Sequence, residues 1–71
     1  MRFSIRTAEI LEEVEVLRRV AAGNANKEVA AQLSIAEETV KAHISSVLSK
    51  LAAKGRTHAV TIGIKRGIID A

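Results

Sequence analysis

Two short helical patterns separated by only three residues place the strongest constraint on the fold of this chain. They occupy residues 26–43, NKEVAAQLSIAEETVKAH. The first pattern has an i, i+4 apolar stripe at Val29 and Leu33, and the second begins a longer stripe at Val40 and Ile44. Because the connection is so short, the two helices cannot lie side by side, and we expect them to cross at a steep angle. The second helix also keeps a polar face that has no evident packing partner.

Composition predicts one small all-α domain. The chain has 71 residues, of which 48% are hydrophobic, but Phe3 is its one aromatic residue, so the core must consist of Leu, Ile, Val and Ala. A domain of this size buries little surface and is marginally stable. Proline is absent and strong helix formers occur throughout, which favours helices over strands.

The residue types that are missing exclude several classes of protein. Without cysteine the chain has neither a disulfide framework nor a cysteine–zinc site, which fits a reducing compartment. No apolar run approaches the roughly 18 residues that span a bilayer, and no secretory signal is recognisable. We therefore expect a cytoplasmic domain with no membrane partner.

Charge is distributed unevenly along the chain. The formal net charge is +3, yet the first expected helix is acidic, with Glu9, Glu12, Glu13 and Glu15. From Thr39 to Ile69 no acidic residue occurs, and the basic side chains there are Lys41, His43, Lys50, Lys54, Arg56, His58, Lys65 and Arg66. A half of one sign attracts polyanions such as nucleic acids. A basic surface kept for solubility explains the same charge equally well.

The periodicity of the apolar residues predicts four helices after a tail at residues 1–7. Their expected ranges are 8–22, 26–33, 37–52 and 57–66, so that residues 8–71 form the domain. Thr7 is the expected N-cap of the first helix, and Gly23 is its expected C′ residue. Gly67 is expected to close the last helix, with Ile68 as the hydrophobic residue that follows in a Schellman motif.

The first and last helices have apolar sides that we expect to face the core. These sides consist of Ile10, Val14, Val16, Leu17, Val20 and Ala21 in the first helix and of Ala59, Val60, Gly63 and Ile64 in the last. Thr61, Ile62 and Lys65 point away, which leaves Ile62 without an apolar partner inside the monomer.

A helical wheel divides the third helix into an apolar side, a polar side and a flank. The apolar side holds Val40, Ile44, Val47, Leu48 and Leu51, the polar side holds Glu38, Lys41, Ala42, Ser45 and Ser49, and the flank holds Thr39, His43, Ser46 and Lys50. The polar side suits the major groove of DNA, because small residues let the backbone approach and Lys41 can donate to guanine O6 and N7. The polar groups of the flank suit phosphate oxygens. An ordinary solvent-exposed face is the alternative interpretation.

No group of residues predicts catalysis, a metal ion or a cofactor. His43 has no second ligand at a suitable spacing on its face, so we expect it to contact a phosphate or a neighbouring helix. Glu13 and Glu15 point to different sides of a helix and cannot act as an acid–base pair. Glu13 falls within the apolar stripe of the first helix, where a carboxylate needs a cation or a row of donors. We therefore expect a protein that is not an enzyme.

A series of short motifs gives the chain a family resemblance. They are E-V-L in the first helix, A-x-G at 21–23, N-K-E-V-A at 26–30, L-x-I at 33–35, T-V-K-x-H at 39–43, K-L at 50–51, R-x-x-A-V at 56–60 and G-I-I at 67–69. Each motif alone is weak, but the full set in this order and spacing is specific. From about Glu13 to Ile69 the chain resembles the C-terminal DNA-binding domain of LuxR/FixJ/NarL-type (GerE-like) transcription regulators of bacteria.

The resemblance implies a four-helix helix-turn-helix domain that binds double-stranded DNA with its third helix in the major groove. The positions that match base contacts are Lys41, Ala42 and Ser45. The expected phosphate contacts are Lys27 and Thr39, from the resemblance, and His43, Ser46 and Lys50, from the flank of the third helix.

The resemblance also implies contacts within and between molecules. The last helix forms a dimer contact in such domains, which here assigns Thr61, Ile62 and Lys65 to a weak homodimer favoured on DNA. Glu13 is expected to pair with Arg56. RNA polymerase is a further candidate partner, and no cofactor is implied.

The chain departs from the family pattern at its helix caps. The usual L-T-x-R-E opening is not legible in EILEEVEVL, so the first helix is expected to start earlier, with Thr7 as its cap. Ala25 replaces the Ser or Thr that caps the second helix, with Asn24 as a shifted substitute, and Ala36 replaces the Ser that often caps the third. Each lost cap costs about 1 kcal/mol of stability.

Two functions from different classes follow. The first is sequence-specific DNA binding by the output domain of a bacterial transcription regulator, located with the nucleoid in the cytoplasm. The second is a helical protein-interaction module that keeps the helix-turn-helix fold without binding DNA. Met1 is compatible with a stand-alone regulator and with a chain from which a receiver or ligand-binding domain has been removed.

Overall fold

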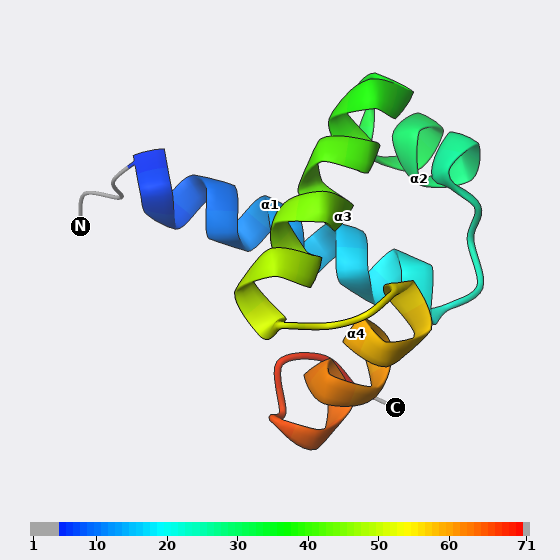
Figure 1. Cartoon of the computed structure of the whole chain (residues 1–71). Helices are drawn as coiled ribbons and strands as arrows, with labels where there is room; N and C mark the ends of the chain where they lie inside the picture. The colour runs from blue at the N-terminus through cyan, green and yellow to red at the C-terminus, as the bar shows by residue number, and fades with distance from the viewer. Residues whose placement is uncertain (1–4, 71) are drawn as a thin grey trace.

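Four α-helices make up the described part of the chain. The computed structural model describes the backbone of residues 5–70 and the side chains of residues 10–70. The helices are α1 (Ile5–Ala21), α2 (Asn26–Leu33), α3 (Glu37–Leu51) and α4 (Arg56–Lys65), as Figure 1 shows. No strand occurs among the described residues, so the expected all-α class is confirmed. None of these helices combines the length and the hydrophobicity needed to cross a membrane.

The first helix begins earlier than expected. Residues 1–4 of the expected tail lie outside the described residues, and α1 starts at Ile5. Thr7 therefore lies inside the helix and cannot be its N-cap, so that expectation is wrong. At the other end, Gly23 has a φ of 95°, and the N–H of Asn24 donates to the carbonyl of Arg19 at 3.2 Å. The C′ role predicted for Gly23 is confirmed, because this bond and the left-handed glycine form a Schellman ending.

The second and third helices begin without a side-chain cap. Ala25 and Ala36 occupy the two N-cap positions, and neither offers a side-chain acceptor. At α2 the carboxylate of Glu28 accepts from the N–H of Ala25 at 2.7 Å, which supplies one half of a capping box. Asn24 is not a substitute cap, since its side-chain amide donates to the carbonyl of Arg19 at 2.9 Å. The expected shifted cap is wrong because Asn24 is engaged at the end of α1.

Two groups of buried side chains form the core, and α1 contributes to both. The first group joins α1, α2 and α3 and contains Val16, Val29, Ala30 and Val40. The second group joins α1, α3, α4 and the last residues of the chain and contains Leu17, Val47, Ala59 and Ile69. Val16 and Leu17 are neighbours about 100° apart on the helix. One short stretch of α1 therefore holds all the other helices in place.

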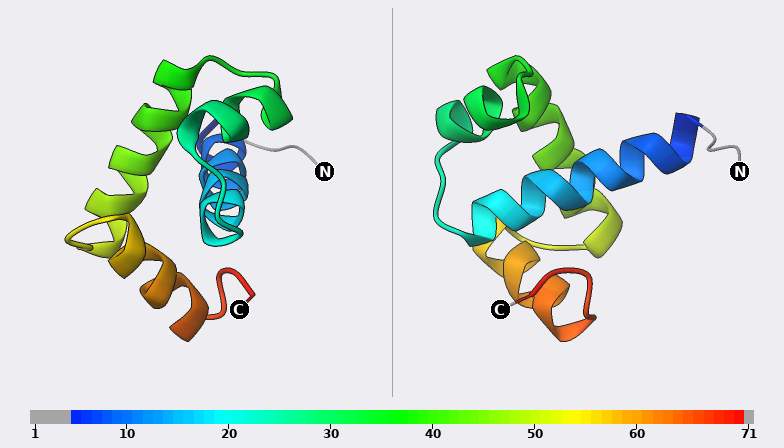
Figure 2. Two further views of the ribbon diagram at one scale, coloured as in Figure 1. Left: turned by 90° about the vertical axis from the view of Figure 1, so that its right-hand side faces the viewer. Right: turned by 180° about the vertical axis from the view of Figure 1, so that it is seen from behind.

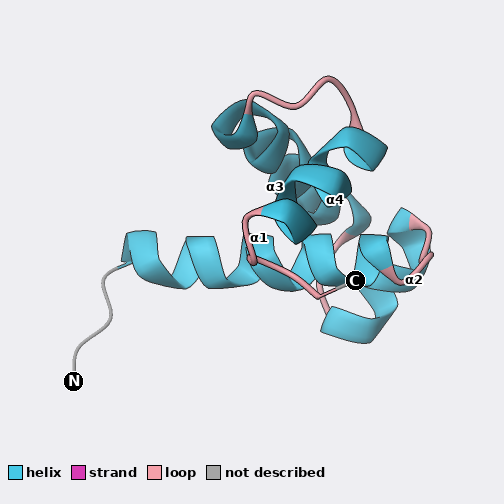
Figure 3. Ribbon diagram, turned by 90° about the horizontal axis from the view of Figure 1, so that it is seen from below, coloured by secondary structure: helices cyan, strands magenta, loops and turns pink. Residues whose placement is uncertain are grey.

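Part of the apolar stripe expected on α1 faces solvent. Ile10 is 43% exposed, and Ala21 is also exposed. The N-terminal half of α1 projects beyond the other helices, as Figure 3 shows. The helical period identified the apolar side of α1, but it could not show where the helices that cover this side end.

The last helix closes at Gly67 as predicted. Gly67 has a φ of 72°, and the N–H of Ile68 donates to the carbonyl of Gly63 at 2.8 Å, which is the expected Schellman motif. Gly63 itself is a close-packing site. A Cβ atom at this position would lie 3.1 Å from Leu17 Cδ2 and 3.2 Å from Ile69 Cγ1.

The side of α4 that faces the core differs in one residue from the expectation. Ala59 and Gly63 are buried, as expected. Ile64 was expected in the core but is 38% exposed, so that assignment is wrong. Ile62 is half-buried and belongs to neither core group. Gly63 makes the close contact with Leu17 of α1, and the next residue, Ile64, lies at the edge of this contact and faces solvent.

The third helix lies across α1 and forms one edge of the molecule. It packs against α1, α2 and α4. In the left view of Figure 2 these three helices lie on the inner side of α3. Within residues 5–70 no helix covers its outer side, so this side is free to contact another molecule.

Candidate nucleic-acid interface

A tight turn sets the relation between α2 and α3. Ser34 follows α2 with a φ of 56°, in the left-handed region. The N–H of Ile35 then donates back to the carbonyl of Ala30 at 3.0 Å, and the side chain of Ile35 packs against the first core group. Because the turn is hydrogen bonded at one side and held in the core at the other, α2 and α3 form one unit. This is the helix–turn–helix predicted from the sequence.

The outer face of α3 consists of Glu38, Lys41, Ala42, Ser45 and Ser49, and all five residues are exposed. The side chains of Glu38 and Lys41 are 86% and 53% exposed, and Lys41 Nζ lies 3.4 Å from Glu38 Oε1. Since the other three residues are small, these two side chains are the long ones on the face. The prediction of a polar side that points away from the core is confirmed.

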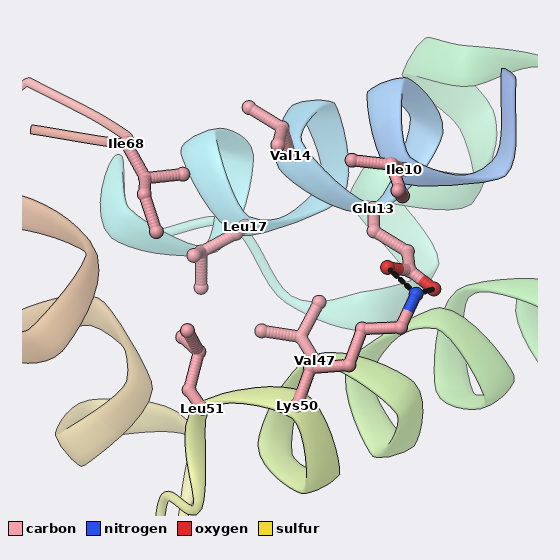
Figure 4. A pocket seen from close by; sticks show the side chains of 8 residues that line it. All are labelled: Ile10, Glu13, Val14, Leu17, Val47, Lys50, Leu51 and Ile68. Atoms are coloured by element: carbon pink, nitrogen blue, oxygen red, sulfur yellow. Dashed lines mark hydrogen bonds and ion pairs between the residues drawn. The ribbon is translucent and has the colours of Figure 1, made fainter. Parts of the chain in front are cut away.

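The inner flank of α3 is fastened to α1 by a buried carboxylate. Glu13 is 6% exposed and accepts hydrogen bonds from Lys50 Nζ at 2.8 and 3.0 Å and from Ser46 Oγ at 2.6 Å. Figure 4 shows the ion pair at one end of an apolar pocket of about 380 Å³, which Leu17, Val47 and other residues line. The need for a partner was correctly predicted from the position of Glu13 in the apolar stripe.

The same contacts determine the charge of Glu13. Burial by itself raises the pKa of Glu13, but the hydrogen bonds from Lys50 and Ser46 and the positive charge of Lys50 lower it by more. The pKa of Glu13 therefore lies below its ordinary value, and the carboxylate is ionised at neutral pH. An ionised carboxylate and an ammonium group thus hold α1 and α3 together.

The expected pair between Glu13 and Arg56 is wrong. Arg56 lies exposed at the start of α4, whereas Ser46 and Lys50 are one turn apart on the side of α3 that faces α1. Sequence reasoning missed these two partners although it had a signal for them. Two donors at i, i+4 on the flank of a helix can both reach a single buried acceptor on the helix packed against it.

Three residues expected to contact phosphates face α1 instead. Ser46 and Lys50 hold Glu13, and the side chain of His43 is only 14% exposed. His43 Nε2 lies 3.2 Å from Glu12 Oε2, yet Nε2 has no hydrogen-bond partner in the described part of the chain, so we regard the pair as a close contact without hydrogen-bond geometry. His43 also belongs to no cluster of three metal-binding side chains among the described residues. These three phosphate assignments are therefore withdrawn.

The two remaining candidates for phosphate contacts are accessible. Lys27 is exposed in the first turn of α2, and Thr39 is exposed in the first turn of α3. An ammonium group and a hydroxyl group both donate hydrogen bonds to phosphate oxygens. Together with the outer face of α3, they give the helix–turn–helix a polar surface with donors on both of its helices.

The comparison with known proteins decides the family. The GerE model, which describes bacterial regulatory proteins of the luxR family, matches residues 6–62. The chain belongs to the LuxR family. Among solved structures, this LuxR-family domain is similar to the transcription factor GerE, with a TM-score of 0.79 and 31% sequence identity over 82% of this chain and 87% of GerE.

Curated relatives of this LuxR-family domain carry the names of regulators. It is 43% identical over 58 residues to the transcriptional regulatory protein YdfI of Bacillus subtilis (strain 168). These residues are 82% of this chain and 27% of YdfI. It is 50% identical over 50 residues to a nitrate/nitrite response regulator protein homolog of Haemophilus influenzae. These residues are 70% of this chain and 24% of that protein. The chain thus spans about a quarter of the length of these relatives.

Family membership assigns the general role of the domain. The LuxR family consists of DNA-binding transcription regulators and not of enzymes, so this chain is a helix-turn-helix domain of the kind that these regulators contain. The four helices, the tight turn and the accessible outer face of α3 are the structural side of the same assignment.

Proposed function

We propose that this LuxR-family domain binds double-stranded DNA at specific sequences, with α3 lying in the major groove. The observation that carries the proposal is the outer face of α3, which is exposed and combines small side chains with the projecting Lys41. The major groove is about 12 Å wide, and a helix with its side chains is about 10–12 Å in diameter. Small residues on the facing side therefore let α3 approach the base edges closely.

Base contacts come from the middle of the outer face. Lys41 donates to guanine O6 and N7, the commonest kind of specific contact for a lysine. Ala42 presents a methyl group that suits the methyl group of thymine, and the hydroxyl of Ser45 can donate or accept. Direct readout by these residues is sparse, since Lys41 is the one long cation among them.

Phosphate contacts come from the edges of the helix–turn–helix. Lys27 and Thr39 donate to phosphate oxygens on either side of the groove. The absence of acidic residues from Thr39 to Ile69 supports this orientation, because it leaves the α3–α4 half of the domain positive.

The domain pairs through α4 when it occupies two half-sites. Thr61 and Lys65 are exposed, Ile62 is half-buried outside the core groups, and the exposed Ile64 adds apolar surface to the same helix. A patch this small gives weak association, so we expect a monomer that dimerises on DNA with half-sites about one helical turn apart. Ile64→Glu should abolish cooperative occupancy of a double site and leave single half-site binding unchanged. Leu11→Glu on α1, at an apolar residue that is 56% exposed against 38% for Ile64, should change neither.

Such a domain acts as the output module of a transcription regulator. It works where the chromosome lies, at the nucleoid in the cytoplasm, and its effect on transcription is exerted on RNA polymerase bound near the same site. The basic half of the chain and the free outer face of α3 support the contact with DNA in this scheme.

Selection of binding sites from random duplex DNA, followed by a salt titration, tests the proposal. Lys41→Ala should cost about 1–3 kcal/mol on the selected site and relax the preference at one base pair. Lys27→Ala should weaken binding to all duplexes equally and reduce the salt slope by about one, because one phosphate contact is lost. Absence of salt-dependent duplex binding would refute the proposal and favour a protein-interaction module with the same fold.

A further inference from the structure

We infer that Glu38 is a specificity-determining residue that accepts a hydrogen bond from the N4 amine of a cytosine while Lys41 binds the guanine paired with it. The inference rests on the proposed docking of α3 in the major groove. It concerns a residue whose negative charge opposes DNA binding in general and so requires a separate explanation.

The first step is the position of Glu38. It lies in the first turn of α3, one turn before Lys41 on the outer face, and its side chain is 86% exposed. Lys41 Nζ lies 3.4 Å from Glu38 Oε1. The ends of the two longest side chains of the outer face can therefore reach adjacent points beyond the helix surface.

The second step is the chemistry that an ionised carboxylate permits. It accepts hydrogen bonds and donates none, and phosphate oxygens repel it. The donors that the major groove offers are the N4 amine of cytosine and the N6 amine of adenine. Once α3 enters the groove, Glu38 must therefore face a base edge that carries an amine or remain hydrated at the cost of binding.

The third step is the match between the ion pair and one base pair. In a G·C pair, guanine O6 and cytosine N4 are hydrogen bonded to each other at about 2.9 Å. An acceptor and a donor thus lie side by side in the groove, at nearly the spacing of Lys41 Nζ and Glu38 Oε1. Guanine N7 gives the ammonium group a second acceptor. In a T·A pair the ammonium group would find one acceptor, thymine O4, beside the thymine methyl group, so G·C is the preferred pair.

Glu37 provides a matched control within the same turn. It is exposed and carries the same charge as Glu38. At about 100° per residue it lies outside the arc that the outer face covers. Removal of either charge should raise the affinity for all duplexes alike, whereas loss of cytosine readout should follow the removal of Glu38 alone.

The experiment compares the parent with Glu38→Ala and Glu37→Ala on the site that the parent selects. Glu38→Ala should reduce the preference for G·C over A·T at one base pair by about tenfold, the range of one specific side-chain contact, because in A·T the acceptor thymine O4 replaces the cytosine N4 donor that faces Glu38. Glu37→Ala should leave that preference unchanged. A melt followed by circular dichroism verifies that both variants fold like the parent.

A modified base separates cytosine readout from general effects. Replacing the cytosine by pyrimidin-2-one removes the N4 amine, so the parent should lose affinity beyond the loss seen for Glu38→Ala. The inference would be overturned, while the proposed function stands, if the parent and Glu38→Ala lost the same affinity on the modified base. Equal changes in base-pair preference for Glu38→Ala and Glu37→Ala would also overturn it. A parent that binds no duplex would overturn both.

Discussion

Replacing Lys50 with methionine should destabilise the domain by about 2–3 kcal/mol at neutral pH, somewhat less than the roughly 3–5 kcal/mol of a broken, fully buried pair. Methionine keeps an apolar stem of similar length but removes the ammonium group that lies 2.8 and 3.0 Å from the carboxylate of Glu13. Glu13 is 6% exposed and would retain the hydrogen bond from Ser46 alone. The expected loss is smaller than this range because the Lys50 side chain is 49% exposed, so solvent screens the pair.

The pH dependence of this loss identifies its cause. In the parent the pKa of Glu13 is lowered, so the ionised carboxylate adds to the free energy of unfolding. This stabilisation is complete above the unfolded-state pKa of about 4.3 and is lost as the pH falls through the pKa of the folded state. Without Lys50, burial dominates and raises the pKa of Glu13, so the variant gains relative stability on protonation. The difference in unfolding free energy between parent and variant should therefore be largest at neutral pH and shrink in acid.

Thermal and urea unfolding followed by far-ultraviolet circular dichroism measure both effects. For a domain of this size the expected loss corresponds to a fall in Tm of roughly 10–20 °C at neutral pH. Lys54→Met is the matched control, because it removes the same charge at an exposed position and should change Tm by no more than a few degrees. A loss of stability that does not vary with pH would show that Lys50 acts through packing, and no loss would show that Glu13 is hydrated.

Two further changes test the packing and the caps. Gly63→Val should destabilise by about 1–3 kcal/mol, because even a Cβ atom would lie 3.1 Å from Leu17, whereas Thr61→Val on the exposed side of the same helix should have little effect in the same melt. Ala25→Ser should stabilise by about 1 kcal/mol, because the extended backbone at this N-cap position lets a serine hydroxyl accept from the N–H of Glu28 and complete the capping box. An unchanged denaturation midpoint for Ala25→Ser would mean that Glu28 already satisfies the helix start.

Features that depend on a few neighbouring residues were readable from the sequence. The four helices, the endings at Gly23 and Gly67 and the tight turn before α3 follow from apolar period and from the left-handed conformation that glycine adopts at little cost. The limit of this local reasoning is visible at Ser34 and Ala52, which adopt φ values of 56° and 52° without being glycine. At these two positions the packing of the flanking helices holds a left-handed conformation that the residue type does not predict.

Residue number is enough to show which side chains share a face of α3, since a helix has a constant period. Which groups each face contacts depends on how the helices pack. Because α3 lies across α1, Lys50 and Ser46 bind Glu13. Arg56 is exposed to solvent, and His43 is largely covered and so is no longer a candidate phosphate contact. The contacts of Glu13 with Ser46 and Lys50 join residues more than thirty positions apart. The distance between two such side chains depends on how the helices pack, and no local pattern contains that information.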